Sequence, residues 1–306
     1  MTTSNSPISK KTGIAAQQSD IVIAPDGSIH ISFLWDDLRD LAGLAARESK
    51  PAPEWNLPLG HLFLASAEYK SCHLCPKQCG FDRDSSRHPR CGDALLRVSN
   101  VGITLGDEPP IRGTRGSGAI MLAGCPLRCP SCHNPEKVAD GAVTDAAGFF
   151  GICKSLLEEG AHNIQILSPT VHLPSLRILL AELKRTGFPL PIVLKSSGYE
   201  RVEELRKLDG LVDIYLPDLK FGSCSAWAVR AGVRNYFSEA RDSIEEMIRQ
   251  VGNLALNEEG LASRGVLVRH VEAPLPPAEK KEILTYLDSL RGRAAVFLNS
   301  HFVSLE

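Results

Sequence analysis

The chain has 306 residues, of which 43% are hydrophobic and 23% charged, enough for a globular core in one large domain with an appendage or in two domains. Its formal net charge of −2 gives no basis for nucleic-acid binding. No apolar run approaches the roughly 20 residues that span a bilayer, and the first residues contain no apolar signal core. We therefore expect a cytoplasmic protein with no membrane partner.

The first part of the chain precedes the main alternating pattern. We expect a disordered tail over residues 1–18, which are polar, and a small extension with a proline-marked linker over 19–60. A cysteine-rich segment then follows over 61–118. The elements predicted here are strands at 21–24 and 29–33 and helices at 35–46 and 62–70.

From residue 119 to 306, short apolar runs alternate with helical patterns. The strands are predicted at 119–123, 163–167, 191–194, 212–216, 265–270 and 294–298. The helices are predicted at 145–159, 174–186, 200–208, 225–251 and 277–290. Such nearly all-apolar strands are typical of parallel strands buried on both faces, so the class is α/β. Six strands are too few for a closed TIM barrel, whereas an open doubly wound sheet and a partial (β/α)6 barrel both fit.

Cys125, Cys129 and Cys132 form a C-x3-C-x2-C motif with no fourth cysteine nearby. A closed cubane iron–sulfur cluster takes four thiolates. Three thiolates leave one iron open, and an open metal position supports chemistry, as it does in catalytic zinc sites. A structural zinc site usually has two pairs of closely spaced cysteine or histidine ligands, and a bacterial ferredoxin would have a different cysteine spacing. The triplet therefore predicts a catalytic iron–sulfur cluster.

A second group of cysteines lies upstream, in the spacing C-x2-C-x3-C-x11-C. Its members are Cys72, Cys75, Cys79 and Cys91. In a cytoplasmic chain this pattern indicates metal binding rather than disulfides. Four thiolates saturate a metal site, so we expect a structural or electron-relaying role, and zinc and a second iron–sulfur cluster both satisfy the pattern.

The triplet, closed by Cys132-His133-Asn134, resembles the signature of the radical S-adenosylmethionine (SAM) superfamily in its pyruvate formate-lyase activating-enzyme-like branch. The upstream CxxCxxxC cluster and the runs at 106–110, 197–200 and 264–270 resemble a subfamily of that branch, and the resemblance covers about residues 70–298. It implies the radical SAM fold, a partial (β/α)6 TIM-like barrel over 119–306 with a small N-terminal cysteine-rich extension.

The resemblance also implies the chemistry. A [4Fe-4S] cluster on Cys125, Cys129 and Cys132 would bind SAM at its open iron and cleave it reductively. The resulting 5′-deoxyadenosyl radical would abstract a hydrogen atom from a protein, with a glycyl-radical enzyme as one candidate, or from a small molecule. The implied reductant is an electron donor such as flavodoxin or ferredoxin.

Polar residues gather just after the predicted strands, at the end where α/β barrels bind ligands. The resemblance assigns cofactor-binding roles to His133, Asn134, Ser168, Thr170, Lys195, Ser197, Asp218, Lys220, Arg269 and His270. The chain departs from the family pattern at Ser131, where an aromatic residue is usual, and at 168–170, where Ser-Pro-Thr replaces Gly-Gly-Glu.

Plainer interpretations stay open for some of these residues. Asp218 and Lys220 also fit a structural ion pair, and His270 also fits a buried core histidine. For the whole chain, the alternative is a non-catalytic iron–sulfur or zinc protein that serves electron transfer or scaffolding. Replacing Cys129 by Ala discriminates, because only the enzyme has SAM cleavage to lose.

Overall fold

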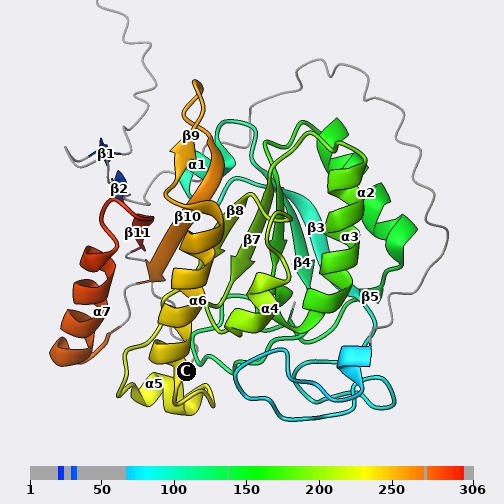
Figure 1. Ribbon diagram of the computed structural model, residues 1–306, viewed down its shortest axis with the longest axis horizontal. Helices are drawn as coiled ribbons and strands as arrows, with labels where there is room; N and C mark the ends of the chain where they lie inside the picture. The colour runs from blue at the N-terminus through cyan, green and yellow to red at the C-terminus, as the bar shows by residue number, and fades with distance from the viewer. Residues whose placement is uncertain (1–19, 24–28, 33–66, 137, 272–273, 300–306) are drawn as a thin grey trace, which may run out of the picture.

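The computed structural model describes residues 20–23, 29–32, 67–136, 138–271 and 274–299 (Figure 1). The tail predicted over 1–18 and the helix predicted at 35–46 lie outside these ranges, as do most of the linker and the start of the helix predicted at 62–70. In the described part of the chain, no helix is long and apolar enough to cross a membrane.

The described strands form one open, mixed sheet in the order β1-β2-β11-β10-β8-β7-β6-β4-β3-β5, with β9 beside β10. Besides β2, which is parallel to its neighbour β11, six of them run parallel and follow one another across the sheet in chain order. These are β4 (Ser117–Leu122), β6 (Ile164–Leu167), β7 (Ile192–Ser196), β8 (Ile214–Pro217), β10 (Ala262–Val271) and β11 (Ala295–Asn299). The others are β1 (Asp20–Ile23), β2 (Ile29–Ser32), β3 (Arg97–Thr104), β5 (Ala142–Val143) and β9 (Ala255–Leu256).

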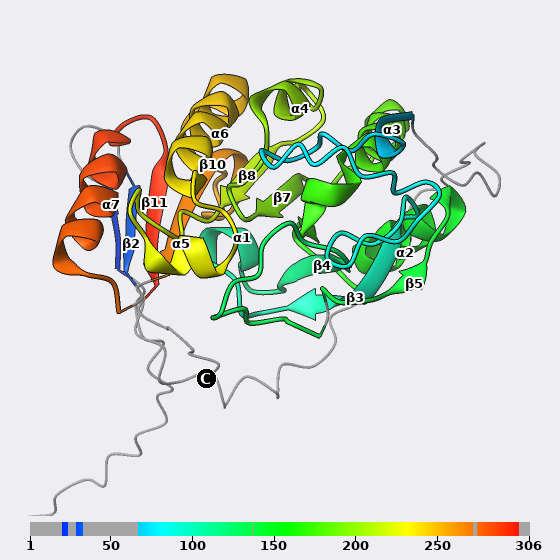
Figure 2. The same ribbon diagram turned by 90° about the horizontal axis from the view of Figure 1, so that it is seen from below.

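The longer helices lie on one side of this sheet (Figure 2). They are α2 (Ala146–Glu158), α3 (Leu173–Arg185), α6 (Tyr236–Val251) and α7 (Pro277–Ser289), and the shorter ones are α1 (Pro109–Arg112), α4 (Val202–Arg206) and α5 (Ala226–Arg230). Their apolar faces pack on the outward side chains of the strands, such as Ile164 and Ile166, which are fully buried. Gln165 lies between these two and points to the opposite face, because side chains alternate along a strand.

The α/β class and the six alternating strands are confirmed. The helix predicted at 225–251 is wrong in one respect, because it is two helices. Gly232 adopts a φ of 73° after α5, which ends that helix before α6 begins at Tyr236. The sheet is open, and its pairings leave the partial (β/α)6 barrel as a prediction.

The parallel strands bring the segments that follow them to one end of the sheet. The cysteine-rich segment, cyan in Figure 1, lies at this same end, although it precedes the sheet in the chain. Both groups of cysteines therefore lie where the predicted ligand-binding residues emerge from the strands.

Candidate active site

A cavity of about 400 Å³ lies at the carboxyl ends of the parallel strands, within the size range of small-molecule sites. It is lined by all three cysteines of the triplet and by nine of the ten predicted cofactor-binding residues. The nine are His133, Asn134, Ser168, Thr170, Lys195, Ser197, Asp218, Lys220 and Arg269. Residues from five separate strand ends thus share one cavity, and the roles assigned to them above stay predictions.

His270 is the predicted residue that does not line this cavity. Its neighbours Arg269 and Val271 do, and since side chains alternate along β10, His270 points to the other face. The imidazole is 1% exposed, and its Nδ1 lies 2.6 Å from the backbone oxygen of Leu219. This placement is that of a hydrogen-bonded core histidine.

The triplet occupies the loop directly after β4. This loop starts at Gly124, where φ is 92° and a Cβ atom would lie 2.7 Å from the backbone oxygen of Cys91, so a side chain here would be strained and would clash. Burial raises the pKa of the Cys125 thiol to about 12, and Cys129 and Cys132 lie close enough to add to the effect. Burial also raises the pKa of Cys129, while the positive charge of Lys220 opposes it.

The donor set fits a cubane cluster with one open iron. Three partly buried cysteines line one cavity and supply three thiols, the number of protein ligands that leaves one iron of a cubane open. Metal binding would convert the thiols to thiolates.

Asp218 is the centre of a charge network at the cavity. Its Oδ1 accepts a hydrogen bond of 2.6 Å from Nε of Arg269, and its Oδ2 accepts one from Nζ of Lys220. Burial opposes ionisation of Asp218, but the two cations prevail and hold its pKa well below its usual value. Asp218 is therefore a carboxylate at neutral pH, as both the cofactor-binding and the ion-pair interpretations require.

Two acidic residues that the sequence analysis did not assign extend this network. Nζ of Lys195 lies 2.5 Å from a carboxylate oxygen of Asp107, and Arg269 lies 3.3 Å from one of Glu108. Both acids are buried, at 8% and 3% exposure. With Asp218 they make three carboxylates against the three cations Lys195, Lys220 and Arg269. The network is charge-balanced and thus preorganised without a ligand.

Glu200 is a third acid that the sequence analysis missed, and it is fully buried behind the cavity wall. The hydroxyls of Thr170 and Ser196 donate to its two carboxylate oxygens at 2.6 and 2.9 Å. Burial raises its pKa to about 7, against the effect of these hydrogen bonds. When Glu200 is ionised, both hydroxyl protons point at it. Oγ of Ser196 already accepts a hydrogen bond of 3.2 Å from the amide of Gly198, so the hydroxyl oxygen of Thr170 is the better placed of the two to accept one from a ligand in the cavity.

Two buried polar atoms of cavity-lining residues have no hydrogen-bond partner among the described residues. They are Oε1 of Gln165 and Oγ of Ser197. Nε2 of Gln165 donates 2.9 Å to Asp107, which fixes the amide with its oxygen unpaired. An unpaired buried acceptor costs about 1–3 kcal/mol, so a ligand that donates hydrogen bonds here would be favoured. Amino and hydroxyl groups, which SAM carries, meet this requirement.

The four upstream cysteines lie apart from the triplet. Cys72, Cys75, Cys79 and Cys91 line a separate cavity of about 330 Å³. The group of four and the group of three therefore line two different cavities. The metal at the upstream group stays a prediction.

The chain is similar to two curated proteins and to several solved structures. An uncharacterized protein of Methanocaldococcus jannaschii is 26% identical over 221 residues, which cover 69% of this chain and 59% of that protein. A putative glycyl-radical enzyme activating enzyme of Haemophilus influenzae is 28% identical over 137 residues, 41% of this chain and 50% of that protein. The chain thus spans little more than half the length of these curated relatives. No protein-family model matches it.

One of these structures is SuiB of Streptococcus suis, at 14% identity with a TM-score of 0.37, over 58% of this chain and 38% of that chain. A likeness this weak carries no argument. The similarity to an activating-enzyme homologue, together with the cysteine triplet, supports the radical SAM superfamily as the general class of this chain. The narrower branch and the substrate are matters of proposal.

Proposed function

We propose that the chain is a radical SAM enzyme of the activating-enzyme-like branch, with a partial barrel fold. Cys125, Cys129 and Cys132 would hold a [4Fe-4S] cluster, which when bound supplies the electron that cleaves SAM to a 5′-deoxyadenosyl radical for hydrogen-atom abstraction. The observation that carries the proposal is the single cavity shared by three thiols, with no fourth, and polar residues from five strand ends.

The residues around the cavity suit the amino-acid part of SAM. Lys220 lies close enough to Cys129 for its charge to favour the thiolate, and its side chain is 27% exposed, more than its partner Asp218. This makes Lys220 the candidate partner of the SAM carboxylate. The unpaired Oγ of Ser197 and the oriented hydroxyl of Thr170 are candidate acceptors for the amino group.

We favour a protein substrate over a small molecule. The sheet is open rather than closed, so a loop of another protein has a side from which to reach the cavity. The name of the Haemophilus influenzae relative, a putative glycyl-radical enzyme activating enzyme, is in keeping with this choice. A low-potential electron donor of the flavodoxin or ferredoxin kind would supply the reducing equivalent.

The test is SAM cleavage by the anaerobically purified, iron-loaded chain with dithionite as the reductant. We expect 5′-deoxyadenosine from the wild type and from Cys224→Ala, which removes an exposed cysteine outside both groups. We expect none from Cys129→Ala. A wild-type chain that carries a full cluster and forms no 5′-deoxyadenosine would favour the non-catalytic iron–sulfur alternative.

A further inference from the structure

The upstream cysteines, spread over residues 72–91, meet around the cavity of about 330 Å³. The first three lie on a tight loop held by backbone hydrogen bonds between Cys72 and Phe81 and between Gly80 and Cys72, of 3.1 and 3.0 Å. Cys91 comes later in the chain and lines the same cavity as the other three. Four thiols around one cavity are the full ligand set of a closed iron–sulfur cluster.

The same cavity is lined by positive charge. Lys77, Arg83, Arg90 and Arg128 all line it, and within the described ranges none of the four forms an ion pair with a carboxylate. Nζ of Lys77 instead donates 2.6 Å to the backbone oxygen of Pro126. A pocket lined by cations that lack countercharges attracts an anionic occupant.

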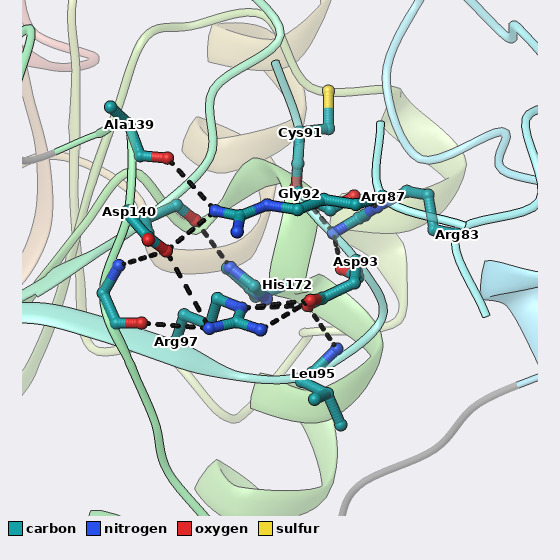
Figure 3. Close-up of polar contacts among 12 residues, drawn as sticks. Arg83, Arg87, Cys91, Gly92, Asp93, Leu95, Arg97, Ala139, Asp140 and His172 are labelled. Carbon is teal, nitrogen blue, oxygen red and sulfur yellow. Dashed lines mark hydrogen bonds and ion pairs between the residues drawn. The ribbon is translucent and has the colours of Figure 1, made fainter. Parts of the chain in front are cut away.

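Arg83 carries the strongest evidence, because its side chain is 1% exposed. Figure 3 shows it beside Cys91, Gly92 and Asp93. Its guanidinium lies over the Tyr69 ring, 5.0 Å from the centroid. Its hydrogen bonds all go to neutral backbone oxygens, those of Val171, Cys91, Gly92 and Asp93, at 2.7, 2.9, 3.3 and 2.6 Å. A buried charge without a countercharge is costly. A metal centre bound by four thiolates carries net negative charge and would supply the countercharge from a cavity that Arg83 itself lines.

We favour a cluster over zinc at this site. A zinc ion needs four sulfurs at about 2.3 Å from one point, whereas each thiolate of a cubane binds a different iron, so a cubane takes up more space. The four cysteines line a cavity of about 330 Å³, which has room for a cubane.

The two cysteine groups are joined by backbone contacts. The amide of Cys125 donates 3.1 Å to the oxygen of Arg90, the residue before Cys91. The absence of a side chain at Gly124 lets the backbone of Cys91 approach the triplet loop, and Pro126 lines both cavities. We propose that Cys72, Cys75, Cys79 and Cys91 hold a closed [4Fe-4S] cluster that relays electrons to the triplet loop. The relay, though not the site itself, rests on the function proposed above.

The relay is a one-electron step in which no bond forms or breaks. A donor of the flavodoxin or ferredoxin class is oxidised by one electron and reduces the upstream cluster. The upstream cluster then returns to its oxidised state as the cluster on the triplet loop is reduced. The neighbouring cations favour the reduced form of the upstream cluster, because they offset the added negative charge.

The site is tested by metal content after anaerobic reconstitution of the full chain. We expect about eight irons and no zinc in the wild type and in Cys224→Ala. We expect about four irons in Cys79→Ala/Cys91→Ala, and about four in Cys129→Ala. In Cys129→Ala the remaining cluster belongs to the upstream group alone, and it should give an electron paramagnetic resonance signal on reduction. Zinc in the upstream group, or full iron retention in the double variant, would overturn the site.

The relay is tested with two reductants. In Cys79→Ala/Cys91→Ala, SAM cleavage with dithionite should match that of Cys224→Ala, whereas cleavage with reduced flavodoxin should fall at least tenfold. Equal rates with flavodoxin would overturn the relay. If the double variant also loses the iron of the triplet, Cys129→Ala is used to test the relay instead. In that variant, reduced flavodoxin must still reduce the upstream cluster. If the wild type never cleaves SAM, only the proposed function is contradicted. The iron content and the electron paramagnetic resonance signal of Cys129→Ala still test the upstream cluster, because neither depends on SAM cleavage.

Discussion

Glu200 gives the site a pH dependence that can be calculated from the structure. Its carboxyl is fully buried against the hydroxyls of Thr170 and Ser196, and burial raises its pKa from 4.5 to about 7. At pH 6 it should be about 90% protonated, against about 3% for a carboxyl of ordinary pKa. Glu200→Gln removes the titration and keeps the shape of the side chain.

The sign follows from the proton balance. Between pH 4.5 and 7, the folded chain keeps a proton on Glu200 that the unfolded chain has released, so the free energy of unfolding falls as pH rises. This contribution is fully present below pH 4.5 and is lost as pH rises through 7. The pKa difference, 7 minus 4.5, is worth about 3 kcal/mol in all, of which about 2.5 kcal/mol falls between pH 5 and 8.

The assay is denaturant unfolding of the wild type and Glu200→Gln from pH 5 to 8, without SAM. The stability of the variant relative to the wild type should rise by about 2.5 kcal/mol across this range. Glu246→Gln is the matched control, because hydrogen bonds from Arg249 lower the pKa of Glu246, which is then ionised at both ends of the range. If the stability difference between Glu200→Gln and the wild type changes as little with pH as that of the control, the reasoning is refuted. The wild type should also show an infrared band of a protonated carboxyl at pH 6 that is missing from Glu200→Gln, and its absence from the wild type would refute the reasoning as well.

Three further predictions concern the same region. Asp218→Asn leaves Lys220 without its carboxylate partner and weakens the pairing of Arg269. The free energy of unfolding, measured by thermal unfolding, should fall by about 3 kcal/mol. An unchanged midpoint of thermal unfolding would contradict the charge network. Gly198→Ala places a Cβ atom 2.5 Å from the backbone oxygen of Asp218, at a φ of +73°. It should lower the free energy of unfolding by about 2 kcal/mol more than Gly252→Ala, where φ is the same and the Cβ atom meets open space. Equal losses in the two variants would exclude the clash. Burial and, to a smaller extent, the charge of Arg83 lower the pKa of His172 from 6.5 to about 4. The free energy of unfolding of the wild type should therefore fall by about 3 kcal/mol as pH falls from 6.5 to 4, whereas that of His172→Gln should not. Parallel acid unfolding curves for the two proteins would contradict this prediction.

The parallel part of the fold could be predicted because its strands are short apolar runs separated by amphipathic helices. Ile164 and Ile166 are of this kind, and they lie fully buried under the helices. β3 was missed for the opposite reason. Arg97–Thr104 mixes polar and apolar residues and is only partly buried, so no apolar run marks it, and its partner β4 determines its structure.

A cysteine motif pointed to Cys125 and a strand end to Asp218, and both residues line the cavity, while their roles stay predictions. Asp107, Glu108 and Glu200 lie in the runs 106–110 and 197–200 that carry the resemblance, but no role was assigned to them, because their roles depend on approach in space. Asp107 lies 88 residues before its partner Lys195, and Glu200 reaches Thr170 across 30 residues. Gln165 did carry a signal, as a lone polar residue within an apolar strand.

The central claim is that SAM binds the open iron of a cluster held by Cys125, Cys129 and Cys132. The most direct measurement is electron–nuclear double resonance on the reduced cluster with SAM labelled with ¹⁵N at its amino group, in the Cys79→Ala/Cys91→Ala variant so that one cluster contributes. The account predicts a ¹⁵N coupling to the cluster. A cluster that is reduced and paramagnetic, with SAM present in excess and no such coupling, would contradict it.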